Sequence, residues 1–159
     1  MIKVTLITLG KLKEKYLRDA VEEYTKRLSR YCALESVELS PQNLPENPSE
    51  KEISMALAKE KEQILKKIPE NSYVFALCVE GKQKSSEQLA EEMREFTNKG
   101  KNFCFIIGSS YGLDKEIKSI ADFKLSLSPM TFPHQLFRVM LLEQIYRGFK
   151  IIEGSSYHK

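Results

Sequence analysis

The sequence predicts a single α/β domain, residues 1–159, with a mostly parallel sheet flanked by helices. Short apolar runs bounded by turn residues alternate five times with segments whose apolar residues recur at helical spacing. That order is typical of a parallel sheet with helices on both faces. No linker, repeat or low-complexity segment divides the chain. Its length is sufficient for one domain with a sizeable core.

The first strand is expected at residues 2–9, an apolar run that ends at Gly10. Residues 11–31 follow with apolar residues at helical spacing and many lysines and arginines on the other faces, the pattern of a solvated helix. Residues 33–39 alternate as a second strand. Residues 40–48 contain three prolines and two asparagines, and they predict a loop.

Continuous apolar runs at residues 73–79 and 102–107 predict two buried central strands. A turn is expected at residues 80–82. The sequence predicts further helices at residues 49–67, opened by a capping box of Ser49 and Glu52, at 86–98 and at 114–120.

The last strand is expected at residues 124–128, where leucine and serine alternate. Because of Pro129 and Pro133, the next residues can form neither a hydrogen-bonded strand nor the interior of a helix. We therefore expect a rigid loop, followed by a helix over residues 134–149. Apolar residues cover more than one face of this helix. A single stripe is enough for a surface helix, so we interpret the extra faces as a subunit contact and expect a homodimer.

Composition bears on three questions: an RNA partner, a metal or disulfide framework, and association with a membrane. The net charge of +3 permits an RNA partner without requiring one. Three widely spaced cysteines without a CxxC pattern argue against a zinc site or a disulfide framework, and no metal is expected. No apolar run approaches the roughly 20 residues of a membrane span, so we expect no membrane association and a cytoplasmic location.

Three strand ends, residues 77–81, 107–112 and 127–133, have the features of a ligand site, because ligands of parallel sheets bind outside the carboxyl ends of strands. The glycine turn at 108–112 allows close approach of a ligand, although a plain tight turn fits as well. The proline loop offers backbone groups that could read an adenine edge. Its alternative is a rigid turn that only starts the helix.

The two histidines differ in setting. His134 lies in a first helical turn, where a structural role is expected. His158 lies beside Tyr157 at the end of the chain, where stacking, hydrogen bonding and charge come together, as in recognition of single-stranded RNA. The alternative for this tail is a frayed, solvated terminus.

Several segments together resemble the RlmH family, SPOUT-class bacterial methyltransferases acting on N3 of a pseudouridine in 23S ribosomal RNA. The matching residues are Leu127-Ser128-Pro129-Met130-Thr131-Phe132-Pro133-His134, Arg138-Val139, Glu143-Gln144, Tyr146-Arg147 and Tyr157-His158-Lys159, with the turn Ile107-Gly108…Gly112-Leu113 and the run Gly10-Lys11-Leu12-Lys13. The chain departs from the family at Ser109, often a glycine, and at Lys159, in some members an arginine.

The resemblance implies a C-terminal trefoil knot, a homodimer and the cofactor S-adenosylmethionine (SAM). By position, the implied cofactor-binding residues are Leu77, Gly108, Leu127, Ser128, Pro129, Met130, Thr131 and Phe132. For catalysis we expect Tyr157 to contact the target base and His158 to accept its proton or orient it. Arg147 and Lys159 are expected to hold phosphate. The alternative functions are a non-catalytic dimeric module that binds RNA or the ribosome, and an α/β enzyme that uses another nucleotide.

Overall fold

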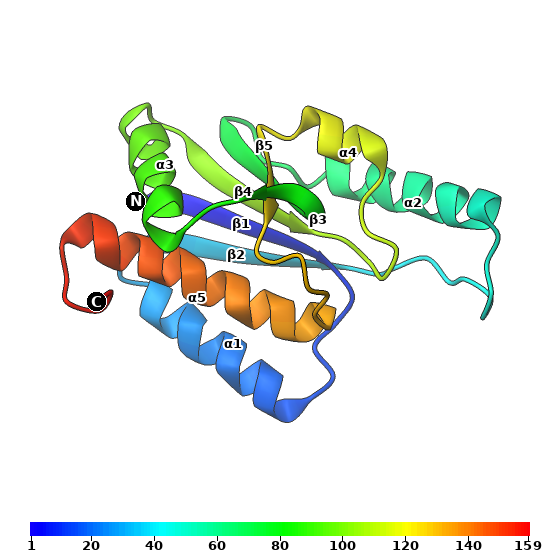
Figure 1. Ribbon diagram of the computed structural model, residues 1–159, viewed down its shortest axis with the longest axis horizontal. Helices are drawn as coiled ribbons and strands as arrows, with labels where there is room; N and C mark the ends of the chain where they lie inside the picture. The colour runs from blue at the N-terminus through cyan, green and yellow to red at the C-terminus, as the bar shows by residue number, and fades with distance from the viewer.

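The computed structural model describes residues 1–159 and contains one five-stranded sheet with the strand order β2-β1-β4-β3-β5 (Figure 1). Every pair of neighbouring strands is parallel, as predicted. The strands are β1 (Ile2–Leu9), β2 (Cys32–Leu39), β3 (Ser72–Gln83), β4 (Asn102–Ile107) and β5 (Phe123–Ser126).

Alternate residues of the central strands face two separate cores. Phe75 and Phe105 lie in one core and their rings stack 4.7 Å apart, whereas Ala76 and Ile106 lie in the other. Because successive strand residues point to opposite faces, a continuous apolar run is what a strand buried on both sides requires. The two cores therefore explain why β3 and β4 read as unbroken apolar segments.

The helices cover both faces of the sheet, as predicted. They are α1 (Lys15–Leu28), α2 (Glu50–Leu65), α3 (Ser86–Asn98), α4 (Lys115–Ile120) and α5 (His134–Glu153). Buried residues of α1, α3 and α5 join the core that contains Phe75, and those of α2 and α4 join the other core. Capping boxes begin α2 and α3, the first of them formed by Ser49 and Glu52 as expected.

Contacts within one chain account for much of the apolar surface of α5. The helix packs on the sheet and against both α1 and α3. Leu141, Leu142 and Ile145 are fully buried, and Val139 and Met140 are partly covered. The excess of apolar residues thus reflects a helix enclosed on three sides of the monomer, so it is not by itself evidence for a subunit interface. The homodimer stays a prediction, as does the trefoil knot.

Several expected boundaries were wrong: α1 ends at Leu28 and not at 31, β5 ends at Ser126 and not at 128, and α5 runs past 149 to Glu153. Two other departures have a clear cause. β3 does not turn at residues 80–82 but continues to Gln83, with a register shift against β5 between Leu77 and Lys82. Gly81 makes this possible, since a Cβ there would lie 2.6 Å from the Lys124 carbonyl oxygen. The helix expected from residue 11 begins at Lys15, because residues 10–14 are held by distant partners described below. No helix is long and apolar enough to cross a membrane.

Candidate functional site

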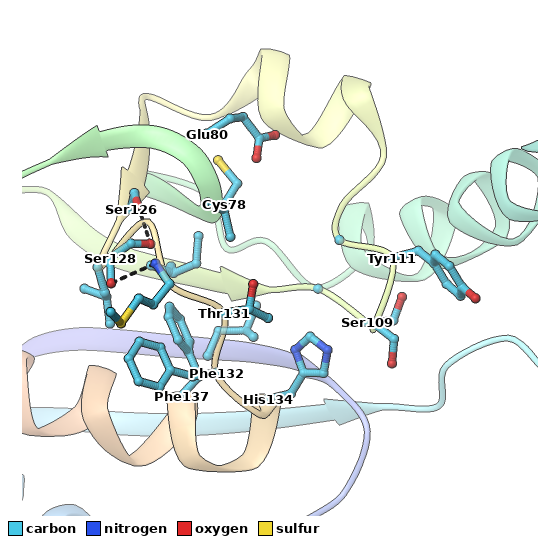
Figure 2. Close-up of a pocket in the computed structure, with 18 of the residues that line it drawn as sticks. Cys78, Glu80, Ser109, Tyr111, Ser126, Ser128, Thr131, Phe132, His134 and Phe137 are labelled. Atoms are coloured by element: carbon cyan, nitrogen blue, oxygen red, sulfur yellow. Dashed lines mark hydrogen bonds between the residues drawn. The ribbon is translucent and has the colours of Figure 1, made fainter.

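The three strand ends expected to form a site lie together. In the sheet β3 stands between β4 and β5, so the loops after these strands share one edge. They enclose a cavity of about 350 Å³, here called the loop cavity (Figure 2). Its lining consists of residues 77–80, residues 107–112, residues 126–132 apart from Pro129, and the side chains of Lys118, His134 and Phe137.

Seven of the eight expected cofactor-binding residues line this cavity. They are Leu77, Gly108, Leu127, Ser128, Met130, Thr131 and Phe132, whereas Pro129 does not reach it. Leu77 is the last residue of β3 to pair with Ile107 of β4 before the chain bends away. Residues that are 50 positions apart in the sequence are thus brought together by strand order. Their role in binding a cofactor stays a prediction.

The glycine turn has an internal reason for its first glycine. A Cβ on Gly108 would lie 2.3 Å from the carbonyl oxygen of Gly112, so a side chain is excluded by the turn itself. Close approach of a ligand, which we expected the glycine turn to allow, is therefore not needed to explain why residue 108 is a glycine. The amide of Gly112 donates to the Ser109 carbonyl at 2.8 Å, and the φ angle of Gly112 is +86°. The turn is closed and rigid before any ligand binds.

Glu60, on α2, holds this turn in place, a role that the sequence pattern did not reveal. It is a buried carboxylate on α2, 3% exposed. One of its oxygens accepts from the Ser109 hydroxyl at 2.8 Å and the other from the amide of Gln42 at 2.9 Å. Burial of a carboxylate is tolerated where such hydrogen bonds satisfy it. Glu60 therefore holds Ser109 at the wall of the loop cavity.

The loop between β5 and α5 is ordered by its own side chains and leaves backbone groups free. The amide of Met130 donates to the Ser128 hydroxyl at 3.0 Å, and the Ser126 hydroxyl donates to the Ser128 carbonyl at 3.1 Å (Figure 2). The amides and carbonyls of Thr131 and Phe132 form no backbone–backbone hydrogen bond. Rigid, unpaired backbone groups beside a cavity are suited to reading the polar edge of a planar ligand.

The cavity also contains titratable groups that sequence reasoning missed or assigned otherwise. Glu80 forms an ion pair with Lys118, and hydrogen bonding from Lys118 lowers the pKa of this carboxyl, so it is ionised at neutral pH. Burial raises the pKa of the Cys78 thiol. His134, expected to be structural, lines the cavity, and desolvation by its surroundings lowers its pKa although the ring stays partly exposed. No group of three or more His, Cys, Asp or Glu side chains is placed to hold a metal ion.

The expected catalytic residues form a separate cluster, here called the tail cluster, where the tail folds back along the C-terminal half of α5. The Tyr157 hydroxyl donates to Glu143 at 2.9 Å, and the Nε of Arg147 donates to the same carboxylate at 2.7 Å. The guanidinium of Arg147 lies 4.7 Å from the centre of the Tyr157 ring. The tail is thus packed against α5, and the alternative of a frayed terminus is wrong.

Both ring nitrogens of His158 are occupied. Its Nδ1 lies 3.1 Å from an Arg147 nitrogen and its Nε2 lies 2.7 Å from Glu87 on α3. Arginine can only donate, so Nδ1 accepts and the ring proton is on Nε2, donated to Glu87. In this arrangement the acceptor nitrogen of His158 already has Arg147 as a partner. A substrate proton could reach that nitrogen only after Arg147 moves.

The tail cluster does not line the loop cavity of its own chain. α5 begins beside the cavity at His134 and runs 20 residues to Glu153, about 30 Å at 1.5 Å per residue (Figure 1). The tail folds back only as far as Glu143, about 14 Å along the axis from His134. Tyr157, His158 and Arg147 are therefore brought together with one another, but not with the expected cofactor site.

Comparison with known proteins gives consistent matches over the whole chain. The model of a family described as "Predicted SPOUT methyltransferase" matches residues 2–158. The chain is 54% identical over 159 residues to the protein named ribosomal RNA large subunit methyltransferase H of Clostridium beijerinckii, covering 99% of this chain and 100% of that protein. It is 49% identical, with the same coverage, to the protein of the same name from Clostridioides difficile.

Among solved structures, one described as "Structural insights into the 2-OH methylation of C/U34 on tRNA" aligns with a TM-score of 0.51 at 13% identity. The alignment covers 96% of this chain and 98% of that chain. At this identity the likeness concerns the fold alone, and it agrees with the single α/β domain described above.

Proposed function

The chain belongs to the SPOUT methyltransferase family, and on that premise we propose that it transfers the methyl group of SAM to N3 of a pseudouridine in 23S ribosomal RNA. The observation that carries the proposal is the loop cavity, where three strand ends meet and the backbone groups of Thr131 and Phe132 stay unpaired beside a partly apolar lining. The relatives named as large-subunit ribosomal RNA methyltransferases support ribosomal RNA as the substrate. A cytoplasmic location follows from that substrate.

The residues of the loop cavity fit SAM. A volume of about 350 Å³ falls within the range of small-molecule sites, roughly 300–1,000 Å³. Leu127, Met130 and Phe132 supply apolar contacts for an adenine ring, and the backbone of Thr131 and Phe132 supplies donors and acceptors for its edge. Glu80 lines the same cavity but is paired with Lys118, so this ion pair adds no net charge beside the proposed sulfonium. When bound, SAM supplies an electrophilic methyl group.

To methylate N3, the protein has to position the RNA and assist the loss of the N3 proton. The acceptor nitrogen must lie in line with the methyl group, so positioning of the RNA contributes much of the rate. N3 of a uracil-type base also bears a proton that has to leave, so a base or a positive charge near the developing anion accelerates transfer. His134 is the histidine that lines the loop cavity, and its lowered pKa keeps it neutral at neutral pH.

The tail cluster meets these demands only if it serves another copy of the chain. Within one chain it lies away from the loop cavity, and Arg147 contacts one ring nitrogen of His158. In a homodimer, Tyr157 and His158 of one subunit could complete the cavity of the other, while Arg147 binds phosphate. We therefore propose that RNA binding breaks the contacts of Arg147 with Glu143 and His158 and frees the histidine.

The test uses ribosomes and large subunits from cells lacking the modification. Tritiated SAM and the purified protein should label 23S RNA, and mass mapping should place the methyl group on N3 of one pseudouridine. Calorimetry should detect SAM binding by the protein alone. If SAM does not bind and the protein still binds ribosomes, the methyltransferase proposal is wrong and the non-catalytic binding module is favoured.

A further inference from the structure

A second cavity of about 350 Å³ opens at the same edge of the sheet, beyond the ends of β1 and β2. It is lined by residues 8–11, Lys13, residues 39–41, Ile107 and three residues of the first turns of α5, His134, Gln135 and Arg138. We call it the basic cavity. Ile107 and His134 line both this cavity and the loop cavity, so the two sites share a wall.

Hydrogen bonds from distant parts of the chain give the basic cavity a fixed shape. The amide of Gly10 donates to the Leu39 carbonyl at 2.7 Å, and Arg138 donates to the Gly10 carbonyl at 3.0 Å. The amide of Lys13 donates to the Gln135 side chain at 2.7 Å. Gly10 has a φ of +116°, which a residue with a side chain rarely adopts. The wall formed by residues 10–13 is therefore held against both β2 and α5.

Positive charge dominates this cavity. Lys11 and Lys13 form no ion pair, and no aspartate or glutamate belongs to the lining. Arg138 is 5% exposed and is paired with Glu38 at 2.8 Å, but its buried Nε has no hydrogen-bond partner. α5 begins here without a side-chain cap and without an acidic residue in its first turn. Its free amides and dipole add partial positive charge at the same place.

We propose that the basic cavity binds the RNA phosphodiester backbone next to the nucleotide that is methylated. This inference rests on the proposed function. A base that enters the loop cavity must leave its stack, and its flanking phosphates then lie within one nucleotide of the methyl group. A fixed, cationic cavity that shares His134 with the loop cavity is placed for those phosphates. Lysine and arginine contacts to phosphate position the strand without reading its sequence.

The carboxylate of SAM is the competing anion, because the two cavities adjoin. Removing positive charge from the basic cavity has different effects for RNA phosphate and for the SAM carboxylate. If phosphate binds, the apparent KM for ribosomes and its salt dependence change while SAM affinity stays the same. If the cofactor carboxylate binds, SAM affinity falls directly.

The experiment compares Lys11→Gln/Lys13→Gln with the matched control Lys66→Gln/Lys67→Gln. Lys66 and Lys67 are exposed, form no ion pair and lie just before β3, at the opposite edge of the sheet. Methyl transfer to unmodified ribosomes is measured at several salt concentrations, and SAM affinity by calorimetry. Melting temperature reports folding of each variant.

We expect Lys11→Gln/Lys13→Gln to raise the KM for ribosomes about tenfold. We also expect it to reduce the slope of log affinity against log salt by about 1.4, or roughly 0.7 for each phosphate that a lysine no longer neutralises. SAM affinity should equal that of the control. A KM and salt slope equal to the control would overturn the proposal, and a parallel loss of SAM affinity would assign the cavity to the cofactor. Failure of the wild-type protein to methylate RNA would instead remove the proposed function, and this inference with it.

Discussion

The two ends of α5 differ in how their polar groups are satisfied. At its start, Thr131 and Phe132 leave backbone groups unpaired beside a cavity, and the helix has no side-chain cap. At its end, Tyr157 and His158 are bonded to Glu143, Arg147 and Glu87. Unpaired, rigid backbone groups beside a cavity are suited to binding a ligand. The tail residues, in contrast, already have hydrogen-bond partners within the chain. The residues expected to be catalytic therefore lie away from the loop cavity of their own chain.

Deletion of Tyr157–Lys159 is the change with the largest expected effect. If the tail supplies the proton acceptor or orients the base, the rate of methyl transfer to ribosomes should fall by about two to four orders of magnitude. SAM affinity should not change, because the loop cavity of each chain forms without its own tail and the tail of the other copy is expected to contact the target base rather than the cofactor. Tritiated methyl transfer and calorimetry measure the two quantities. Deletion of Lys159 alone separates the loss of its charge from the loss of Tyr157 and His158. A wild-type rate in the longer deletion would return the search for the base to the loop cavity.

Ser110→Trp should produce the opposite pattern, with a smaller effect on the rate at saturating cofactor. Ser110 is exposed at the wall of the loop cavity, so an indole there would fill part of the space without entering a core. We expect SAM to bind at least about tenfold more weakly, a loss of about 1.4 kcal/mol. The control is Ser156→Trp, at an exposed position of the tail. Equal SAM affinity in both variants would show that the cofactor binds elsewhere.

His134 should give the smallest effect, seen in stability against pH. Its pKa in the folded chain is lowered from 6.5 by desolvation, so in the window just below pH 6.5 the unfolded chain binds more protons. The free energy of unfolding should therefore fall as pH drops from 6.5 towards the folded pKa, and His134→Gln should lack that part of the decline. Urea unfolding at pH 5.0 to 7.5 measures it. Identical profiles for the variant and the wild type would contradict this role of His134.

Local patterns predicted most of the fold. The alternation of strand and helix, the capping box at Ser49 and the convergence of three strand ends all follow from spacing within short segments, and the structure confirms them. The boundaries that failed depend on distant partners. Residues 10–14 are not helical because Gln135, 122 positions beyond Lys13, holds the amide of Lys13. β3 runs on past Val79 because Gly81 lets the β5 backbone approach closely.

The candidate site divides in the same way. The loop that contains residues 127–132 was predicted because proline and strand alternation mark a rigid loop after a strand, and the family resemblance named its residues, of which all but Pro129 line the cavity. Glu60 was not, since nothing near it in the sequence shows that it meets Ser109, 49 positions away. Spacing in the sequence also could not show that Glu87 contacts the ring of His158, which lies 71 positions later. Contacts of this kind depend on the packing of α2 and α3 against the sheet, which no local pattern encodes.

A structure of the protein bound to S-adenosylhomocysteine tests the central claim most directly. We predict that the product lies in the loop cavity, with its adenine edge bonded to the backbone of residues 127–132 and its ring against Leu127 and Phe132. We also predict that Tyr157 and His158 near that ligand come from the other copy of the chain. An adenine ring bound outside the loop cavity would contradict the assignment of the cofactor site, whatever activity the protein shows.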